Sequence, residues 1–207
     1  MILGLFAFPK KIEKTKKSSK VQKSLLLGPL ICGTSYGYLE SGLVALLPIL
    51  AVQEFKTVPE YCLVTVILAA AASSVFWGTL SDRQGAKKTV ILLLAVLGFG
   101  SSFFAVSSFF LSPIMTIYLS CVLFGTLAGG LYPVGFSWLL HDLPESQYGY
   151  ASGAFARAYG LGSLAGPLAT GAIAQNWGSH GLFLMMGGLG ILGLLLTLKF
   201  GEKPFLR

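Results

Sequence analysis

The sequence predicts an all-α membrane protein, a single bundle of six transmembrane helices over residues 24–201, and three observations support this. The chain of 207 residues is 54% hydrophobic and only 11% charged, whereas soluble proteins carry about 25% charged residues. Its apolar residues are grouped in runs of about 20, the length that crosses the ~30 Å hydrocarbon core of a bilayer. Short polar turns separate these runs. Such a chain could not cover its apolar surface with polar groups in water.

The first three spans are predicted at residues 24–52, 59–80 and 89–110. The first ends at the polar turn 53–57, the second ends in a charged turn, and Ser112-Pro113 closes the third. Each run is long enough to cross a bilayer as a helix.

The last three spans are predicted at residues 114–140, 151–177 and 182–200. Gly129-Gly130 and Pro133 interrupt the first of these, and membrane helices tolerate such breaks because neighbouring helices can satisfy the freed carbonyl groups. A polar loop at 141–147 precedes the fifth span, and Gly178 to His180 turn the chain into the sixth.

Two short segments flank the bundle. Residues 1–23 combine an apolar stretch, Met1 to Pro9, with a basic linker that holds seven of the fifteen Lys and Arg residues. The apolar stretch is too short to span a bilayer and lacks the charged start and cleavage site of a signal peptide. We expect it to be the remnant of an earlier helix, followed by a cytoplasmic linker. Residues 202–207 are expected to form a cytoplasmic tail.

The distribution of basic residues predicts the orientation. Six spans put both termini on one side, and thirteen of the fifteen Lys and Arg residues fall on that side, with only Lys56 opposite and Arg157 inside a span. Cytoplasmic loops carry the excess of basic residues, so both termini are expected to be cytoplasmic. The net charge of +7 therefore reports topology, and no nucleic-acid partner is expected. The aromatic residues near span ends are expected to be interfacial anchors: Trp77, Tyr132, Trp138 and Trp177.

No pattern indicates an enzyme, a cofactor or a metal site. The three cysteines show neither metal-ligand spacing nor a disulfide framework. The segment 85–89 lacks the spacing of a phosphate-binding loop, and Gly160 to Ala165 resembles a dinucleotide fingerprint without the preceding strand. No span carries a His, Asp and Ser constellation.

The charged turn after the second span reads Gly78-Thr79-Leu80-Ser81-Asp82-Arg83-Gln84-Gly85-Ala86-Lys87-Lys88. Gly78 would allow close approach of another helix, and Gly85 would permit a tight reversal into the third span. Asp82, at the cytoplasmic end of the second span, could face a helix N-terminus or pair with Arg83. A turn that only obeyed the positive-inside rule would need basic residues such as Lys87 and Lys88, but neither the glycine frame nor the aspartate.

A second motif lies in the fifth span. It contains Gly162, Gly166, Pro167 and Gly171. Small residues four apart form a groove for close helix packing, and the proline permits a bend.

Both motifs resemble signatures of the major facilitator superfamily of secondary transporters. The charged turn resembles the loop between the second and third helices of each half, with Ala86 in place of a basic residue. The glycine motif resembles a fifth-helix signature, with Thr170 in place of one glycine. The basic linker, together with segments 130–134 and 159–167 that resemble helices ten and eleven of bacterial members, indicates the C-terminal six-helix half of a transporter.

Glu40 is the only acidic residue deep in a predicted span. An ionised carboxylate facing lipid is unfavourable by several kcal/mol, so Glu40 is expected to face a polar cavity or a partner inside the bundle. Tyr36 lies one helical turn earlier on the same side. We expect these two residues to bind substrate or couple protons, and the alternative is a protonated or hydrogen-bonded structural acid. Arg157, about seven residues inside the fifth span, is a candidate counter-ion unless it reaches the interface by snorkelling.

The resemblance implies transport of a small solute by alternating access in the bacterial inner membrane, with proton-coupled efflux as one form. It implies that the bundle contacts membrane lipid and that it also binds a protein partner. This partner would be a second six-helix half or a second copy of this chain. The turn 78–88 would act in gating, with Asp82 facing a helix end in the other half. The alternative is a six-helix subunit or fragment that binds a partner half without transporting anything. No residue pattern selects the substrate.

Overall fold

The computed structural model describes residues 23–107, 110–141 and 143–200. The predicted N-terminal remnant, nearly all of the basic linker and the C-terminal tail lie outside the described residues. The helices are α1 (Lys23–Gln53), α2 (Pro59–Gln84), α3 (Ala86–Ser107), α4 (Pro113–His141), the short 3₁₀ helix η1 (Glu145–Gln147) and α5 (Tyr148–Phe200). Within these ranges the chain contains no strand, and the predicted all-α class is confirmed.

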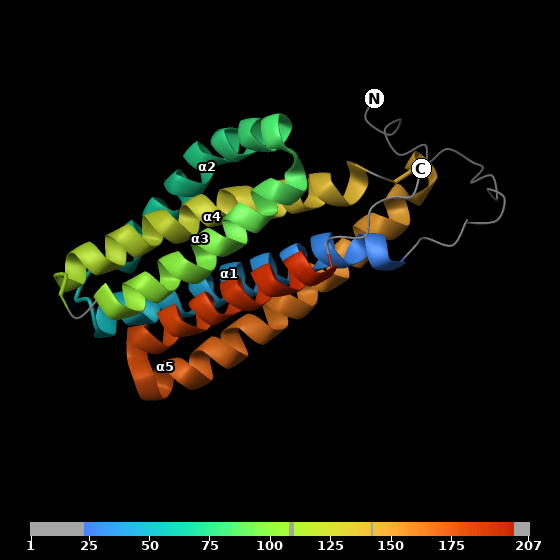
Figure 1. The fold of residues 1–207 in the computed structure, drawn as a ribbon. Coiled ribbons are helices and arrows are strands. Elements are labelled where there is room, and N and C mark those ends of the chain that lie inside the picture. The colour runs from blue at the N-terminus through green and yellow to red at the C-terminus, as the bar shows by residue number, and fades with distance from the viewer. Residues whose placement is uncertain (1–22, 108–109, 142, 201–207) are drawn as a thin grey trace, which may run out of the picture.

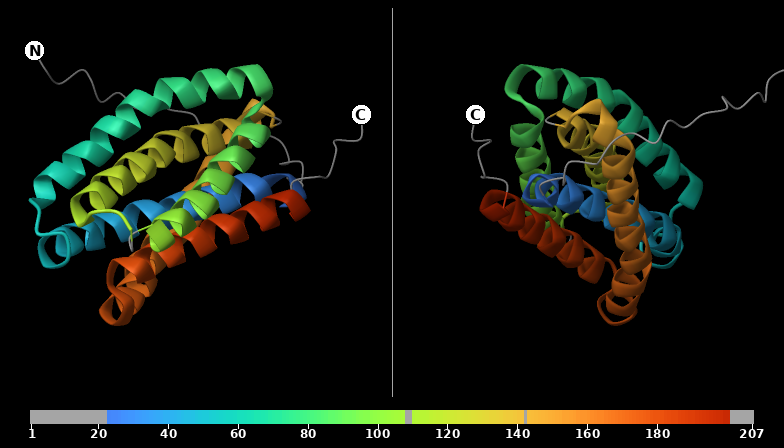
Figure 2. Two further views of the ribbon diagram at one scale, coloured as in Figure 1. Left: turned by 60° about the vertical axis from the view of Figure 1, so that its left-hand side comes forward. Right: turned by 90° about the vertical axis from the view of Figure 1, so that its right-hand side faces the viewer.

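The last helix, α5, consists of two arms. Gly178 interrupts it with φ 56° and ψ −142°, a backbone conformation that favours glycine because side chains with a Cβ atom clash there. The chain reverses direction at this point (Figures 1 and 2). The fifth and sixth predicted spans therefore correspond to the two arms, and the five helices of membrane-spanning length provide six crossing segments.

The predicted charged turn is much shorter in the structure. The second helix continues through Asp82 and Arg83 to Gln84, and α3 begins at Ala86. Gly85 alone reverses the chain, with φ 92°, and its N–H donates to the Ser81 carbonyl oxygen at 2.8 Å. A single glycine suffices because it can adopt a positive φ without strain.

Glycines bring the helices of the bundle into backbone contact. Gly125 of α4 faces the Val66 backbone of α2, and Gly129 faces the Ala70 backbone one turn further along. The Trp77 indole N–H donates to the Thr126 carbonyl oxygen at 2.8 Å. Trp77 is 5% exposed, so its expected role as an interfacial anchor is wrong: the indole N–H finds its acceptor inside the bundle.

Different helix ends and loops lie at the two ends of the bundle. The start of α1, the junction of α2 with α3 and the end of α5 lie at one end, while the loops α1–α2 and α3–α4 and the turn within α5 lie at the other (Figure 1). A core of large side chains runs between them, and its largest fully buried members include Phe124, Phe155, Phe183 and Leu97. Successive connections between the helices thus alternate between the two ends, as six successive crossings of a membrane require.

At the end that holds the α1–α2 and α3–α4 loops, the α1–α2 loop is hydrogen-bonded to the turn within α5. The Ser179 N–H donates to the two carboxylate oxygens of Glu54 at 2.9 and 3.1 Å. The amide belongs to the first turn of the second arm of α5, where backbone N–H groups lack acceptors within the helix. The Glu54 carboxylate thus caps this arm from another part of the chain.

Candidate functional site

A hydrogen bond joins Glu40, near the middle of α1, to the first arm of α5. The Tyr159 hydroxyl donates to Oε2 of Glu40 at 2.8 Å. Gly37 makes this contact possible, because a Cβ atom there would meet the Tyr159 carbonyl oxygen. The small residues beside Glu40 therefore bring the two backbones together, and the acid finds its partner within the bundle.

Three tyrosines from three helices surround the carboxylate. Tyr36 of α1 stacks on Tyr159 of α5 with ring centroids 5.7 Å apart, and it lies 5.3 Å from Tyr132 of α4. The rings of Tyr132 and Tyr159 meet edge to face at 6.1 Å. Tyr36 precedes Glu40 by one helical turn, so the two side chains lie on the same side of α1. We call Glu40 and these three tyrosines the acid–tyrosine site.

The acid–tyrosine site is accessible from one side of the bundle. Glu40, Tyr36 and Tyr159 are half-buried, and Tyr132 is 41% exposed. On the inner side, Phe155 packs edge to face against Tyr132 with centroids 5.4 Å apart, and it is 1% exposed. The tyrosine rings therefore pack against the core on their inner side and are partly exposed on their outer side.

Sequence reasoning missed two members of this site. Tyr132 was expected to be an interfacial anchor, but its ring contacts Tyr36 and Tyr159 instead. Tyr159 carried no prediction of its own. Its spacing to Gly162 was the available signal, since Gly162 faces the Thr34 backbone of α1 and so turns the same face of α5 towards Glu40.

Arg157 lies apart from Glu40. It precedes Tyr159 by two residues, which places it on a different face of the helix, and its side chain is exposed. It borders an open groove of about 440 Å³ that is otherwise lined by Leu27, Leu30, Tyr150, Ala154, Ala158 and Leu161. Among the described residues no ion pair joins Arg157 to Glu40, and its role in substrate binding stays a prediction.

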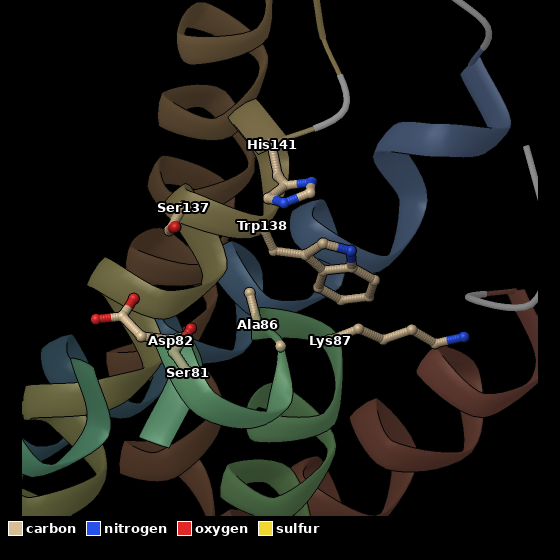
Figure 3. A pocket seen from close by; sticks show the side chains of 8 residues that line it. Ser81, Asp82, Ala86, Lys87, Ser137, Trp138 and His141 are labelled. Carbon is tan, nitrogen blue, oxygen red and sulfur yellow. The ribbon is translucent and has the colours of Figure 1, made fainter. Parts of the chain in front are cut away.

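The predicted gating residues surround a polar cavity at the end of α2. The cavity has a volume of about 470 Å³ and is lined by Ser81, Asp82, Gly85, Ala86, Lys87, Ser137, Trp138 and His141. Figure 3 shows that Asp82 and Lys87 point in different directions, with Lys87 extending past Trp138. Asp82, Arg83 and Lys88 are exposed. The part of the chain that the structure describes offers Asp82 no ion-pair partner, and the gating role stays a prediction.

The glycines of the two motifs differ in what they face. Gly162 and Gly166 lie against the α1 backbone, near Thr34 and Tyr38, whereas a Cβ atom added at Gly171 or Gly78 would meet nothing within 4 Å. Pro167 lies inside the first arm of α5. Gly162 and Gly166 therefore serve packing within this chain, whereas Gly171 and Gly78 have no neighbour at the Cβ position.

Residues 29–206 match the Major Facilitator Superfamily. "Multidrug resistance protein MdtG" of Enterobacter lignolyticus (strain SCF1) is 31% identical over 140 residues, which are 67% of this chain and 32% of that protein. The protein of the same name from Klebsiella pneumoniae (strain 342) is 32% identical over 138 residues, again 67% of this chain and 32% of the relative. The chain spans about a third of the length of the curated relatives it matches.

Proposed function

Because the chain belongs to the Major Facilitator Superfamily, we propose that it forms half of a secondary transporter that moves a small solute across the bacterial inner membrane by alternating access. The direction we propose is efflux. In support, the similar proteins are called multidrug resistance proteins, and export of toxic compounds is one way in which a membrane transporter can confer resistance. The chain is thus proposed to act in transport and not as an enzyme.

The observation that carries the proposal is the Glu40–Tyr159 hydrogen bond. A carboxylate at this depth is unfavourable in lipid, and such residues occur where they face a cavity, a partner group or a proton pathway. Glu40 is only half-buried, so its carboxylate can meet a solute or exchange a proton from the open side. We propose that Glu40 and Tyr36 line the transport site and that protonation of Glu40 couples transport to a proton gradient.

We further propose that a second six-helix half, or a second copy of this chain, covers the exposed surface of α2. Only 11% of the most apolar stretch of α2 is buried within the chain, against 44–50% of the other spanning helices. Figures 1 and 2 show α2 at one side of the bundle, next to α4. Ala71 and Ala72 on this surface are exposed, and a Cβ atom added at Gly78 would meet nothing within 4 Å, so another helix could approach closely at these small residues.

Transport measured in reconstituted vesicles tests the proposal. The purified chain is placed in liposomes alone and together with a six-helix N-terminal half taken from a curated relative. A proton gradient is imposed, and movement of a panel of drug-like solutes is followed with and without an uncoupler. We expect uncoupler-sensitive flux that Glu40→Gln abolishes. A lack of flux in both preparations, with correctly folded protein, would favour the alternative of a subunit that binds a partner half without transporting.

A further inference from the structure

We propose that Cys62 of α2 and Cys121 of α4 form a disulfide bond, which links these two helices near the end of the bundle that holds the α1–α2 and α3–α4 loops. Both residues are free thiols in the structure, and both are 0% exposed. The inference goes beyond the proposed transport function and does not depend on it. It comes from the register of the two helices, the burial of both side chains and the compartment that this end of the bundle is expected to face.

Two glycines of α4 fix its register against α2. A Cβ atom added at Gly125 would meet the Val66 carbonyl oxygen, and one added at Gly129 would meet the Ala70 carbonyl oxygen. Each helix advances by four residues, or about one turn, from the first contact to the second. The two helices therefore run in the same direction with their backbones in contact, because small residues allow such a close approach.

The same register brings the two cysteines together. Cys62 and Cys121 each lie one turn before a member of the first glycine contact, on the same face of their helix. On the far side of this pair the hydroxyl oxygens of Thr57 and Tyr118 lie 3.2 Å apart, so α4 stays beside the chain up to the start of α2. Contacts on both sides thus set Cys62 opposite Cys121. Helices in backbone contact suit a disulfide, whose Cα atoms lie roughly 4.4–6.8 Å apart.

The burial of Cys62 stands out on a helix that is otherwise exposed. Its most apolar stretch is only 11% buried within the chain, and Cys62 and Trp77 are the two buried residues of α2. The Trp77 indole bonds to the Thr126 carbonyl oxygen of α4, near the other end of the helix pair. A bond from Cys62 to Cys121 would fix the start of α2 in the same way, on the spanning helix that the bundle covers least.

This end of the bundle is expected to face the periplasm. The α1–α2 and α3–α4 loops lie at the end opposite the start of α1 (Figure 1), and the positive-inside rule predicts that the start of α1 is cytoplasmic. Disulfides form and persist in the bacterial periplasm, whereas the cytoplasm keeps thiols reduced. Cys62 is the fourth residue of α2, so its thiol is the one nearer to the periplasmic water.

The oxidant would be a periplasmic dithiol–disulfide oxidoreductase in its disulfide form, acting before α4 packs on α2 and buries both thiols. The Cys62 thiolate attacks one sulfur of the oxidant and releases the other as a thiolate, which leaves a mixed disulfide. The Cys121 thiolate then attacks the Cys62 sulfur, closes the new bond and releases the second thiolate of the oxidant. The two protons lost by the cysteines pass to these two thiolates, so one disulfide forms and one is reduced.

Counting free thiols in cells that make the full 207-residue chain tests the inference. The chain is produced in a Gram-negative host and in a matched host that lacks periplasmic thiol oxidoreductases. Acid stops thiol exchange in the intact cells, and the denatured protein is treated with a maleimide whose adducts are counted by intact mass. The first host should yield one adduct, at Cys32, and all three cysteines should react after reduction. In chains from the second host all three should react without reduction.

Two variants serve as matched controls in the first host. Cys32→Ala keeps the proposed pair and should take up no maleimide before reduction. Cys62→Ala leaves Cys32 and Cys121, and both should react. They are too far apart to pair, because the Cys32 thiol donates to the Leu131 carbonyl oxygen of α4, about 15 Å along the helix from Cys121. Peptide mapping of the unmodified chain identifies the two linked cysteines.

Thermal unfolding in detergent compares the oxidised and reduced chains, which share one sequence, so no variant has to fold. The bond closes a long loop and restricts the unfolded chain, and the midpoint of the oxidised chain should be higher by about 5–15 °C. The inference is overturned if all three cysteines react in unreduced chains from the first host, or if the linked peptides contain Cys32. A bond between Cys62 and Cys121 that left the midpoint unchanged would show that it does not hold α2 in place.

Discussion

The Ser179 N–H lies 2.9 and 3.1 Å from the two carboxylate oxygens of Glu54, so that a residue just beyond α1 caps the second arm of α5. The neighbouring Gly178 leaves room for this contact, because a Cβ atom there would collide with the Glu54 carboxylate. The negative carboxylate also lies at the positive end of the helix dipole of this arm. One side chain therefore holds together the two loops at this end of the bundle.

We predict that Glu54→Gln destabilises the folded chain. The amide keeps a hydrogen-bond acceptor but loses the charge, so the free energy of unfolding should fall by about 1 kcal/mol. The midpoint of thermal unfolding in detergent measures the effect. Glu60→Gln removes the same charge from the first turn of α2 without touching Ser179, and it should shift the midpoint less. Equal shifts for the two variants would show that the cap does not stabilise the turn.

A substitution at Gly178 should be more damaging than one at Glu54. Alanine in place of Gly178 would have to adopt a φ of 56° and to displace the Glu54 carboxylate, and such backbone strain is unfavourable by about 1–3 kcal/mol. The control is Gly188→Ala in the second arm of α5, where an added Cβ atom meets nothing within 4 Å. Thermal unfolding should show a loss for Gly178→Ala and no loss for Gly188→Ala.

Substitutions at two glycines of the fifth-span motif should distinguish packing within the chain from contact with a partner. Leucine at Gly162 would push α5 away from the Thr34 backbone of α1 and pull Tyr159 away from Glu40, so we expect a low yield of folded protein. A Cβ atom added at Gly171 would meet no neighbour within 4 Å, so leucine there should leave the stability of the chain unchanged. Folded yield is measured by size-exclusion chromatography in detergent. A loss of transport with Gly171→Leu at full stability would indicate that a partner packs there.

Much of the fold could be predicted from the sequence, because membrane spans depend on local hydropathy. All six spans appear near their predicted positions, and the turn at Gly178 was expected. The site was only half predicted, since Glu40 is conspicuous as a lone intramembrane acid but its partner lies 119 residues away. Local patterns cannot tell which helices are neighbours, and they could not reveal that Tyr159 faces Glu40 while Arg157, two residues earlier, faces outward.

Cysteine labelling should establish the orientation of the chain. The native thiols Cys32, Cys62 and Cys121 are fully buried, so a membrane-impermeant maleimide should not label the wild type. Lys56 and Arg83 are exposed at opposite ends of the bundle. If both termini are cytoplasmic, Lys56→Cys should react in spheroplasts, whose inner membrane faces the reagent, and Arg83→Cys should react only after the membrane is permeabilised. The reverse pattern would contradict the positive-inside assignment.

Asp82 should affect transport without affecting folding. Its side chain is exposed and lines the cavity at the end of α2, where none of the described residues pairs with it, so Asp82→Asn should not shift thermal unfolding of the chain. If Asp82 faces a helix end in a partner half, the same variant should lower flux in liposomes that hold both halves, since an uncharged amide interacts more weakly with a helix N-terminus. Glu145→Gln, a matched loss of charge in η1 at the same end of the bundle, should leave the flux unchanged. A drop in thermal stability with Asp82→Asn would instead assign Asp82 a role within this chain.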